Sequence, residues 1–171
     1  MTKSGSFPGN PRVDRPDMPS GYGIQSGDDE MSLVPLSHIN EQMQKSRNYW
    51  VCTSRPDGSP HAMPVWGVWL DGDFFFSTDL QSRKGHNLAA NPHIVVHLES
   101  GDDVVILEGI VERATDSAVL KRADTAYFAK YQFHLAEDVD HPGLVYRLQA
   151  RAAYTWFEKS FPTSATRWRF E

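Results

Sequence analysis

The sequence of 171 residues has one cysteine, Cys52, and therefore cannot form an internal disulfide bond. It contains no uninterrupted apolar run of the ~18 residues that a membrane-spanning helix needs. Residues 1–17 also lack the apolar segment of a secretion signal. We therefore expect a soluble, cytoplasmic protein. The length fits one domain, large enough to bury a hydrophobic core without covalent cross-links.

Positive charge is scarce, since 17 Lys and Arg residues stand against 22 Asp and Glu residues, for a net charge of -5. Nucleic-acid-binding domains usually carry a dominant basic face. We therefore expect no nucleic-acid partner. One local basic pocket for an anion remains compatible with this composition.

Motifs for metal binding and covalent catalysis are also missing. His93 and His97 lie four residues apart on a predicted strand, without a carboxylate at metal-motif spacing. Cys52 lies in an apolar strand, which favours an inert thiol. Neither a Gly-x-Ser-x-Gly elbow nor a glycine-rich phosphate loop occurs. We expect no metal site and interpret one acidic, histidine-containing loop as solvated surface (His134, Glu137, Asp138, Asp140 and His141).

The first 32 residues differ in composition from the rest of the chain. They contain four prolines and five glycines but few large apolar side chains. Such a segment buries too little surface to offset its ordering entropy. We predict an extended or flexible arm over residues 1–32, which Tyr22 and Ile24 could attach to the body, and a globular domain over residues 33–171.

Short β-strands dominate the predicted domain. Asp57-Gly58 and Asp71-Gly72 separate apolar runs, which is a strong hairpin signal. Helices are few, and each begins at a capping residue. This pattern is typical of a mainly β protein, a barrel of about six to seven antiparallel strands with peripheral helices. The predicted strands are 49–54, 61–70, 73–78, 93–98, 104–111, 144–149 and 153–157; the predicted helices are 37–46 capped by Ser37, 82–90 capped by Ser82, and 116–131 capped by Asp116.

A candidate anion site lies between a strand end and a helix start. Ser77 and Thr78 close the strand, and four residues later Ser82, Arg83 and Lys84 open the helix. Free N–H groups and the positive end of the helix dipole attract anions there. Two cations at a helix N-terminus oppose the dipole, so helix stability alone does not explain them. The alternative is a simple serine cap followed by surface charges.

Tryptophan is unusually frequent, with five residues in this chain. Pro64 and Gly67 interrupt the predicted strand 61–70, which suggests a bulge or a flat ligand close to the backbone. Trp66 and Trp69 could form a wall of that site, although core or dimer packing explains Trp69 at least as well. We expect Trp50 to lie in the core.

The order of these segments resembles a known family. It runs YWVCTSRPDGSPHAMPVWGVWLDG, FFFSTDLQSRKGHNLAANP, VILEGIVERATD and a closing ATRWRF, between Asn48 and Glu171. It resembles the pyridoxamine 5'-phosphate oxidase-like split β-barrels, and more closely the flavin/deazaflavin oxidoreductase branch that includes F420-dependent reductases. The resemblance implies an FMN-binding-like split β-barrel and a homodimer with two cofactor sites at the interface.

The resemblance also implies roles for particular residues. The cofactor phosphate would contact the helix start, the strand end would flank the ribityl chain, and the interrupted strand would back the tricyclic ring. Elements near the C-terminus would close the site from the partner subunit. These residues are Ser82, Arg83, Lys84 and Asn87 for the phosphate; Ser77 and Thr78 for the ribityl chain; Pro64, Val65 and Trp66 for the ring; and Trp156, Arg167 and Trp168 for closure.

The implied cofactor is F420, with FMN as the alternative. F420 carries an anionic tail that needs a basic groove, which four cations could supply: Arg55, Lys121, Arg122 and Lys130. The implied reaction is hydride transfer to an unsaturated small molecule. The candidate proton donors are His61 and Tyr22.

The chain departs from two branches of this family. It ends Thr166-Arg167-Trp168-Arg169-Phe170 without the Arg-Leu-x-Pro type of substrate motif, which disfavours vitamin B6 oxidation. Its last histidine is His141, which disfavours the C-terminal His loop of haem-binding relatives. Three alternatives stay open: an FMN-dependent oxidoreductase, a non-catalytic cofactor carrier, and an interaction module in which Trp66, Trp69 and Trp168 form only a dimer contact.

Overall fold

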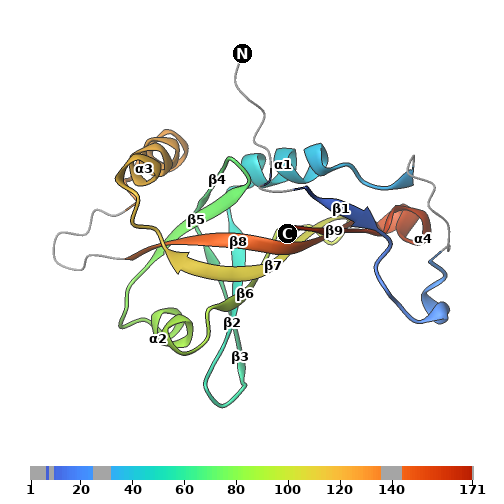
Figure 1. The fold of residues 1–171 in the computed structure, drawn as a ribbon, viewed down its shortest axis with the longest axis horizontal. Helices are drawn as coiled ribbons and strands as arrows, with labels where there is room; N and C mark the ends of the chain where they lie inside the picture. Colours follow the sequence, from blue (N-terminus) through green and yellow to red (C-terminus); the bar gives the residue numbers. More distant parts are fainter. Residues whose placement is uncertain (1–6, 8–9, 25–31, 136–143, 171) are drawn as a thin grey trace.

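The computed structural model describes residues 7, 10–24, 32–135 and 144–170, and these residues form one antiparallel sheet with helices around it (Figure 1). The elements are β1 (Arg12–Asp14), a 3-10 turn (Ser20–Tyr22), α1 (Leu36–Lys45), β2 (Tyr49–Ser54), β3 (Pro60–Val65), β4 (Val68–Leu70), β5 (Asp73–Thr78), α2 (Arg83–Ala90), β6 (His93–His97), β7 (Asp103–Arg113), α3 (Ser117–Tyr131), β8 (Leu144–Phe157), a 3-10 turn (Glu158–Ser160), α4 (Phe161–Ser164) and β9 (Thr166–Arg169).

The sheet has the topology of a split β-barrel. Its strands follow the order β4-β5-β8-β7-β6-β2-β3, and the second half of β8 also pairs with β9, which pairs with β1. β3 and β4 are consecutive in the chain, yet they lie at the two ends of this path. The barrel therefore opens between them. The predicted mainly β fold with peripheral helices is confirmed.

Alternating side chains fill the barrel. On β2, Tyr49, Val51 and Thr53 face inward and are buried, while the residues between them are half-buried. A strand with one face on a core has this period of two. Phe74 and Phe76 from β5 enter the same core. A second apolar cluster lies under α3 and includes Val68, Phe75, Ala123, Tyr131, Leu135 and Val145.

The predicted strand 61–70 is wrong, because the chain breaks at Trp66 and Gly67 into β3 and β4. The three consecutive strands predicted here are therefore four strands in two hairpins. The N–H of Gly67 donates to the Tyr131 hydroxyl (3.1 Å), and its carbonyl oxygen accepts from Lys130 Nζ (3.3 Å). A β-carbon at this position would lie 2.4 Å from the Phe74 ring. Side chains of α3 thus form the hydrogen bonds with the Gly67 backbone that a neighbouring strand would form with a continuous strand.

Two further predictions about strands and helices also need correction. The strands expected at 144–149 and 153–157 are one strand, β8, because a bulge at Glu108/Gly109 absorbs Arg151 without ending the pairing. The first helix begins at Leu36 after Pro35, so Ser37 lies inside its first turn and does not cap it.

Trp50 does not lie in the core. Its neighbours on β2 point inward, so Trp50 points to the outer face of the sheet and stacks on His97 with the ring centroids 6.1 Å apart. Trp69 is the core tryptophan. It is 6% exposed, and its Nε1 donates to Asn40 Oδ1 at 2.8 Å.

Parts of residues 1–32 pack on the domain. Phe7 is buried and stacks on Phe170, with the ring centroids 4.4 Å apart. β1 pairs with β9, and Asp14 accepts hydrogen bonds from Arg167. Tyr22 is 58% exposed and contacts the edge of Phe161 at 6.4 Å.

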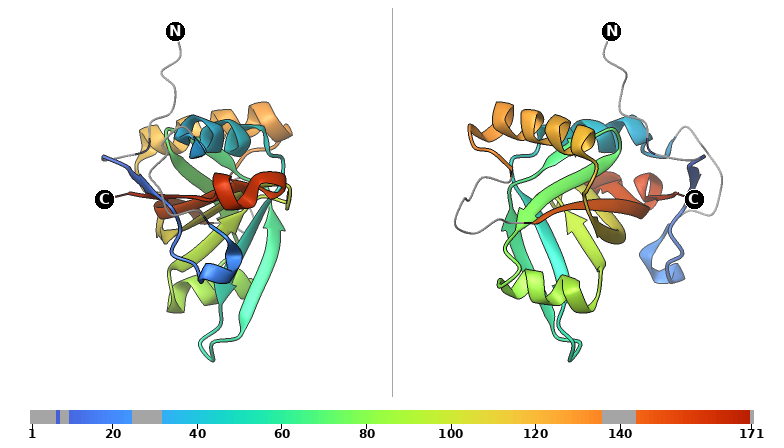
Figure 2. Two further views of the ribbon diagram at one scale, coloured as in Figure 1. Left: turned by 90° about the vertical axis from the view of Figure 1, so that its right-hand side faces the viewer. Right: turned by 60° about the vertical axis from the view of Figure 1, so that its left-hand side comes forward.

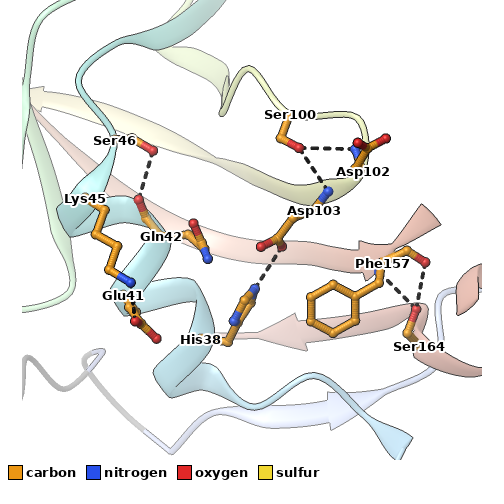
Figure 3. A network of polar contacts seen from close by, with 10 residues as sticks. All are labelled: His38, Glu41, Gln42, Lys45, Ser46, Ser100, Asp102, Asp103, Phe157 and Ser164. Atoms are coloured by element: carbon orange, nitrogen blue, oxygen red, sulfur yellow. Dashed lines mark hydrogen bonds and ion pairs between the residues drawn. The ribbon is translucent and has the colours of Figure 1, made fainter. Parts of the chain in front are cut away.

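The helices lie on opposite sides of the barrel. α1 and α3 lie together on one side, and α2 lies on the other (Figures 1 and 2). Figure 3 shows how α1 is fixed: His38 Nε2 lies 2.8 Å from Asp103 Oδ1 at the start of β7, and the His38 ring contacts the edge of the Phe157 ring. This polar network lies on the side of the barrel away from α2.

Candidate cofactor-phosphate site

The end of β5 and the start of α2 are joined by hydroxyl groups. Ser82 caps the helix as predicted, because its Oγ accepts from the N–H of Gly85 at 2.9 Å. The Ser82 Oγ also lies 3.0 Å from Thr78 Oγ1 and donates to the carbonyl oxygen of Asp79 at 2.7 Å. The predicted strand end and helix start therefore lie side by side.

Two polar side chains of α2 are buried on one face of the helix. Lys84 is 9% exposed and Asn87 is 0% exposed, and their spacing of three residues places them next to each other. The Lys84 Nζ lies 5.9 Å from the centroid of the Phe76 ring. Burial lowers the pKa of Lys84. The Oδ1 atom of Asn87 is buried without a hydrogen-bond partner.

The β2–β3 hairpin forms a second wall beside these residues. Asn87 Nδ2 donates to Thr53 Oγ1 at 2.8 Å, and Thr53 Oγ1 lies 3.4 Å from His61 Nδ1. Ser82, Lys84, Asn87, Thr53 and His61 are called the α2 cradle below. Sequence reasoning missed Thr53, although a hydroxyl at a core-facing position of β2 is a signal that the alternation could have shown.

Positive charge gathers at the α2 cradle. Burial lowers the pKa of His61, and the charges of Lys84, Arg55 and Arg83 lower it further. In the described part of the chain, no carboxylate lies within 4.0 Å of these three cations. A buried ammonium group without a counter-ion is costly. The arrangement therefore fits an anionic ligand group.

The residues predicted to back a ring lie at the other end of β3. Pro64 is exposed, Val65 packs against the core, and Trp66 is 38% exposed. The Trp66 ring stacks on Tyr131 (4.8 Å, 9°), and the Arg47 guanidinium lies 5.5 Å from the centroid of the Trp66 ring. Trp66 follows His61 by five positions along extended backbone, or ~16 Å. Only an elongated ligand would reach both.

The predicted closing residues lie far from α2 within one chain (Figure 1). Trp156 packs edge-on against Phe161, and Trp168 Nε1 donates to the carbonyl oxygen of Val34. Arg167 pairs with Asp14. Only a second copy of the chain could bring these residues to the α2 cradle.

The four cations expected to form one basic groove do not lie together. Arg55 acts on His61 at the α2 cradle, whereas Lys121, Arg122 and Lys130 belong to α3 on the opposite side of the barrel. Arg122 pairs with Asp71. Lys130 Nζ donates to the Tyr49 hydroxyl at 2.7 Å. Within one chain, these four cations therefore do not form a single basic groove.

Within the described residues, no three His, Cys, Asp or Glu side chains are grouped as a metal site would require. His134 pairs with Asp124 at 2.8 Å, while residues 137–141 of the same predicted acidic loop lie outside the described residues. Burial raises the pKa of Cys52, which disfavours its thiolate form.

Comparison with known proteins now gives the family. The sequence profile of pyridoxamine 5'-phosphate oxidase matches residues 36–157. This chain belongs to the pyridoxamine 5'-phosphate oxidase family. It is 39% identical over 82 residues to a pyridoxine/pyridoxamine 5'-phosphate oxidase from Gluconobacter oxydans (strain 621H). The match covers 46% of this chain and only 38% of that oxidase.

Solved structures show the same fold at lower identity. An F420 reductase is 19% identical with a TM-score of 0.56, and the match covers 70% of this chain and 98% of the reductase. A haem-binding protein from Mycobacterium smegmatis is 20% identical with a TM-score of 0.57, and the match covers 71% of this chain and 55% of that protein. Proteins that share this fold therefore differ in what they bind. Among the described residues of this family member, no helix is both long and apolar enough to cross a membrane.

Proposed function

We propose that this protein is an oxidoreductase that binds a phosphate-bearing flavin or deazaflavin at the α2 cradle. The observation that carries the proposal is the buried pair of Lys84 and Asn87. Among the described residues, Lys84 has no carboxylate partner and Asn87 Oδ1 has no hydrogen-bond partner. A phosphate group would offset the buried charge and complete the hydrogen bonds of the site. Family membership supports the same assignment.

The residues of the chain would bind and orient the cofactor. Ser82, Arg83, Lys84 and Asn87 would hold the phosphate, Ser77 and Thr78 would flank the ribityl chain, and Pro64, Val65 and Trp66 would back the ring. The cofactor supplies hydride transfer when bound, and the protein contributes position and electrostatics. His61 lies at the phosphate end of this arrangement and Tyr22 lies near α4, so neither reaches the Trp66 end of β3 within one chain.

F420 is the cofactor that the resemblance favours, and FMN is the second candidate. One observation favours FMN: of the four cations considered for the anionic tail of F420, only Arg55 lies at the α2 cradle. The Arg55 side chain is exposed at the β2–β3 turn and could contact a tail carboxylate. The two cofactors therefore have to be compared directly.

A homodimer forms part of the proposal. The expected closing residues can reach the site only from a partner subunit, because within one chain they lie on the far side of the barrel from α2. These residues are Trp156 in β8 and Arg167 and Trp168 in β9. The edge strand β3 exposes Met63, and Trp66 is exposed directly after the strand ends. β3 has no further neighbour among the described strands. Exposed apolar edge strands are usually covered.

Binding and turnover of the two cofactors test this function. Purified protein is mixed with F420 or FMN, binding is followed by cofactor fluorescence, and the reduced bound cofactor is offered enones, quinones and tetrapyrroles. We expect saturable binding of at least one cofactor and reoxidation by one substrate class. Binding without reoxidation would indicate a carrier. Failure to bind either cofactor would refute the proposal.

A further inference from the structure

A row of hydrogen bonds between three side chains of the α2 cradle links the β2–β3 hairpin to α2. Asn87 Nδ2 donates to Thr53 Oγ1 (2.8 Å), and Thr53 Oγ1 lies 3.4 Å from His61 Nδ1. In this arrangement the Thr53 hydroxyl can donate its proton to a neutral His61 ring. The Asn87 Oδ1 atom at the other end has no partner. The row of hydrogen bonds is therefore complete at His61, whereas at Asn87 the Oδ1 atom lacks a donor.

The same three side chains can also hydrogen-bond in the opposite direction. A protonated His61 would donate to Thr53 Oγ1, the Thr53 hydroxyl would donate to Asn87 Oδ1, and the Asn87 NH2 group would turn towards an anion. The Asn87 Oδ1 atom, which lacks a partner in the first arrangement, then accepts a hydrogen bond. The reversal needs one proton, taken from solvent, and one anion beside Asn87.

The charges around His61 explain why the anion and the proton depend on each other. The charged groups that act on His61 are Lys84 and Arg83 on α2 and Arg55 after β2. All three are cations. Burial, and then these charges, lower the pKa of His61 below its ordinary value, which favours the neutral form of His61 in the free protein. An anion beside Lys84 would offset this repulsion.

We propose that His61 takes up a proton when a phosphate group enters the α2 cradle, so that the anion and the proton are bound together. The inference rests on the proposed function only for the source of the phosphate, which is the cofactor. Because the bound form has the higher His61 pKa, affinity for the anion rises as the pH falls from the bound pKa to the free pKa. Outside that window His61 contributes no pH dependence.

The direct test measures the pKa of His61 by NMR titration of its imidazole C–H signal. The variant His61→Asn assigns this signal, because the signal disappears in its spectrum. The probe is inorganic sulfate, which stays a dianion throughout the titration, and sodium chloride at equal ionic strength is the control. We expect sulfate to raise the His61 pKa by ~1 unit. His86, which is exposed on α2, is the control histidine and should show no such shift. Equal His61 pKa values in sulfate and chloride, or equal shifts at His61 and His86, would overturn the inference.

A variant tests the electrostatic cause without a ligand. Arg83 is exposed, so Arg83→Gln removes one cation with little effect on packing. We expect this variant to raise the His61 pKa in chloride, and an unchanged value would count against the inference.

If sulfate raises the His61 pKa but neither F420 nor FMN binds, the proposed function fails and the proton-linked anion site stands. If a cofactor binds and the His61 pKa does not respond to sulfate, only this inference fails.

Discussion

At the scale of single residues, the buried charge of Lys84 lowers the stability of the free protein but favours binding of an anion. Lys84 is 9% exposed and has no carboxylate partner among the described residues, which destabilises the free protein. Its folded pKa lies below the unfolded value of 10.5. This penalty is therefore fully present below the folded pKa and disappears as the pH rises from there to 10.5.

Replacing Lys84 with Met should therefore have two effects of opposite sign. We expect Lys84→Met to raise the free energy of unfolding of the free protein at neutral pH. We also expect it to weaken cofactor binding by about 1.5–3 kcal/mol, the value of a charge-assisted hydrogen bond. Urea denaturation and fluorescence titration measure the two effects. Lys121→Met, an exposed lysine on α3, is the control; wild-type affinity in Lys84→Met would remove Lys84 from the site.

At the scale of single elements, the start of α2 is held close to the turn before it. A β-carbon on Gly85 would lie 2.3 Å from the carbonyl oxygen of Asp79 and 2.7 Å from that of Leu80. These are backbone atoms, so they cannot turn away as a side chain can. Glycine at position 85 therefore allows α2 to begin this close to the preceding turn, which positions the α2 cradle.

We expect Gly85→Ala to lower the free energy of unfolding by about 1–3 kcal/mol and to weaken sulfate and cofactor binding, because the helix start must shift. Gly101→Ala is the matched control, because a β-carbon there meets no atom within 4 Å. Its effect should stay within about 0.5 kcal/mol. Denaturant titration of both variants measures this difference, and equal losses would contradict the close approach at Gly85.

The end of α3 is fixed to the β3–β4 break through Lys130. Its Nζ donates to the Tyr49 hydroxyl and to the Gly67 carbonyl oxygen. Burial, and then the charge of Arg47, lowers the pKa of Lys130 to about 8. Between pH 8 and 10.5 the unfolded chain therefore binds more protons at this residue than the folded chain does.

This difference predicts a pH dependence of stability. The contribution of Lys130 to the free energy of unfolding should rise with pH between about 8 and 10.5, and Lys130→Met should lack this rise. Urea denaturation at several pH values compares the slopes, with Lys121→Met again as the control. Identical slopes in the wild type and Lys130→Met would show that the ammonium group is not buried as described.

At the scale of the whole molecule, the site would be shared between two subunits. In that case a mixed dimer of Lys84→Met and Trp156→Ala chains contains one doubly altered site and one unaltered site. We expect each homodimeric variant to bind cofactor weakly and the mixed dimer, isolated through two affinity tags, to regain one tight site. Light scattering checks the dimer itself. A mixed dimer without a tight site, or a monomer in solution, would place the whole site within one chain.

Much of the fold could be predicted from local sequence patterns. The Asp-Gly turns predicted the two hairpins, and Ser82 predicted the start of α2. Local patterns failed where distant residues decide the structure. Tyr131 and Lys130 satisfy the backbone at Gly67 and so break a predicted strand, while a bulge joins two predicted strands into β8.

The sequence by itself determined the strand-rich class and a helix that opens with Ser82, Arg83 and Lys84, because turns, caps and alternation depend on neighbours in the chain. Only the tertiary structure decided that Trp69 is buried and Trp50 is not. It also decided that Thr53 and His61 meet Asn87 from the other side of the α2 cradle. The physical reason is that hydrogen bonding and burial depend on side chains that the fold brings together, here 34 residues apart for Thr53 and Asn87.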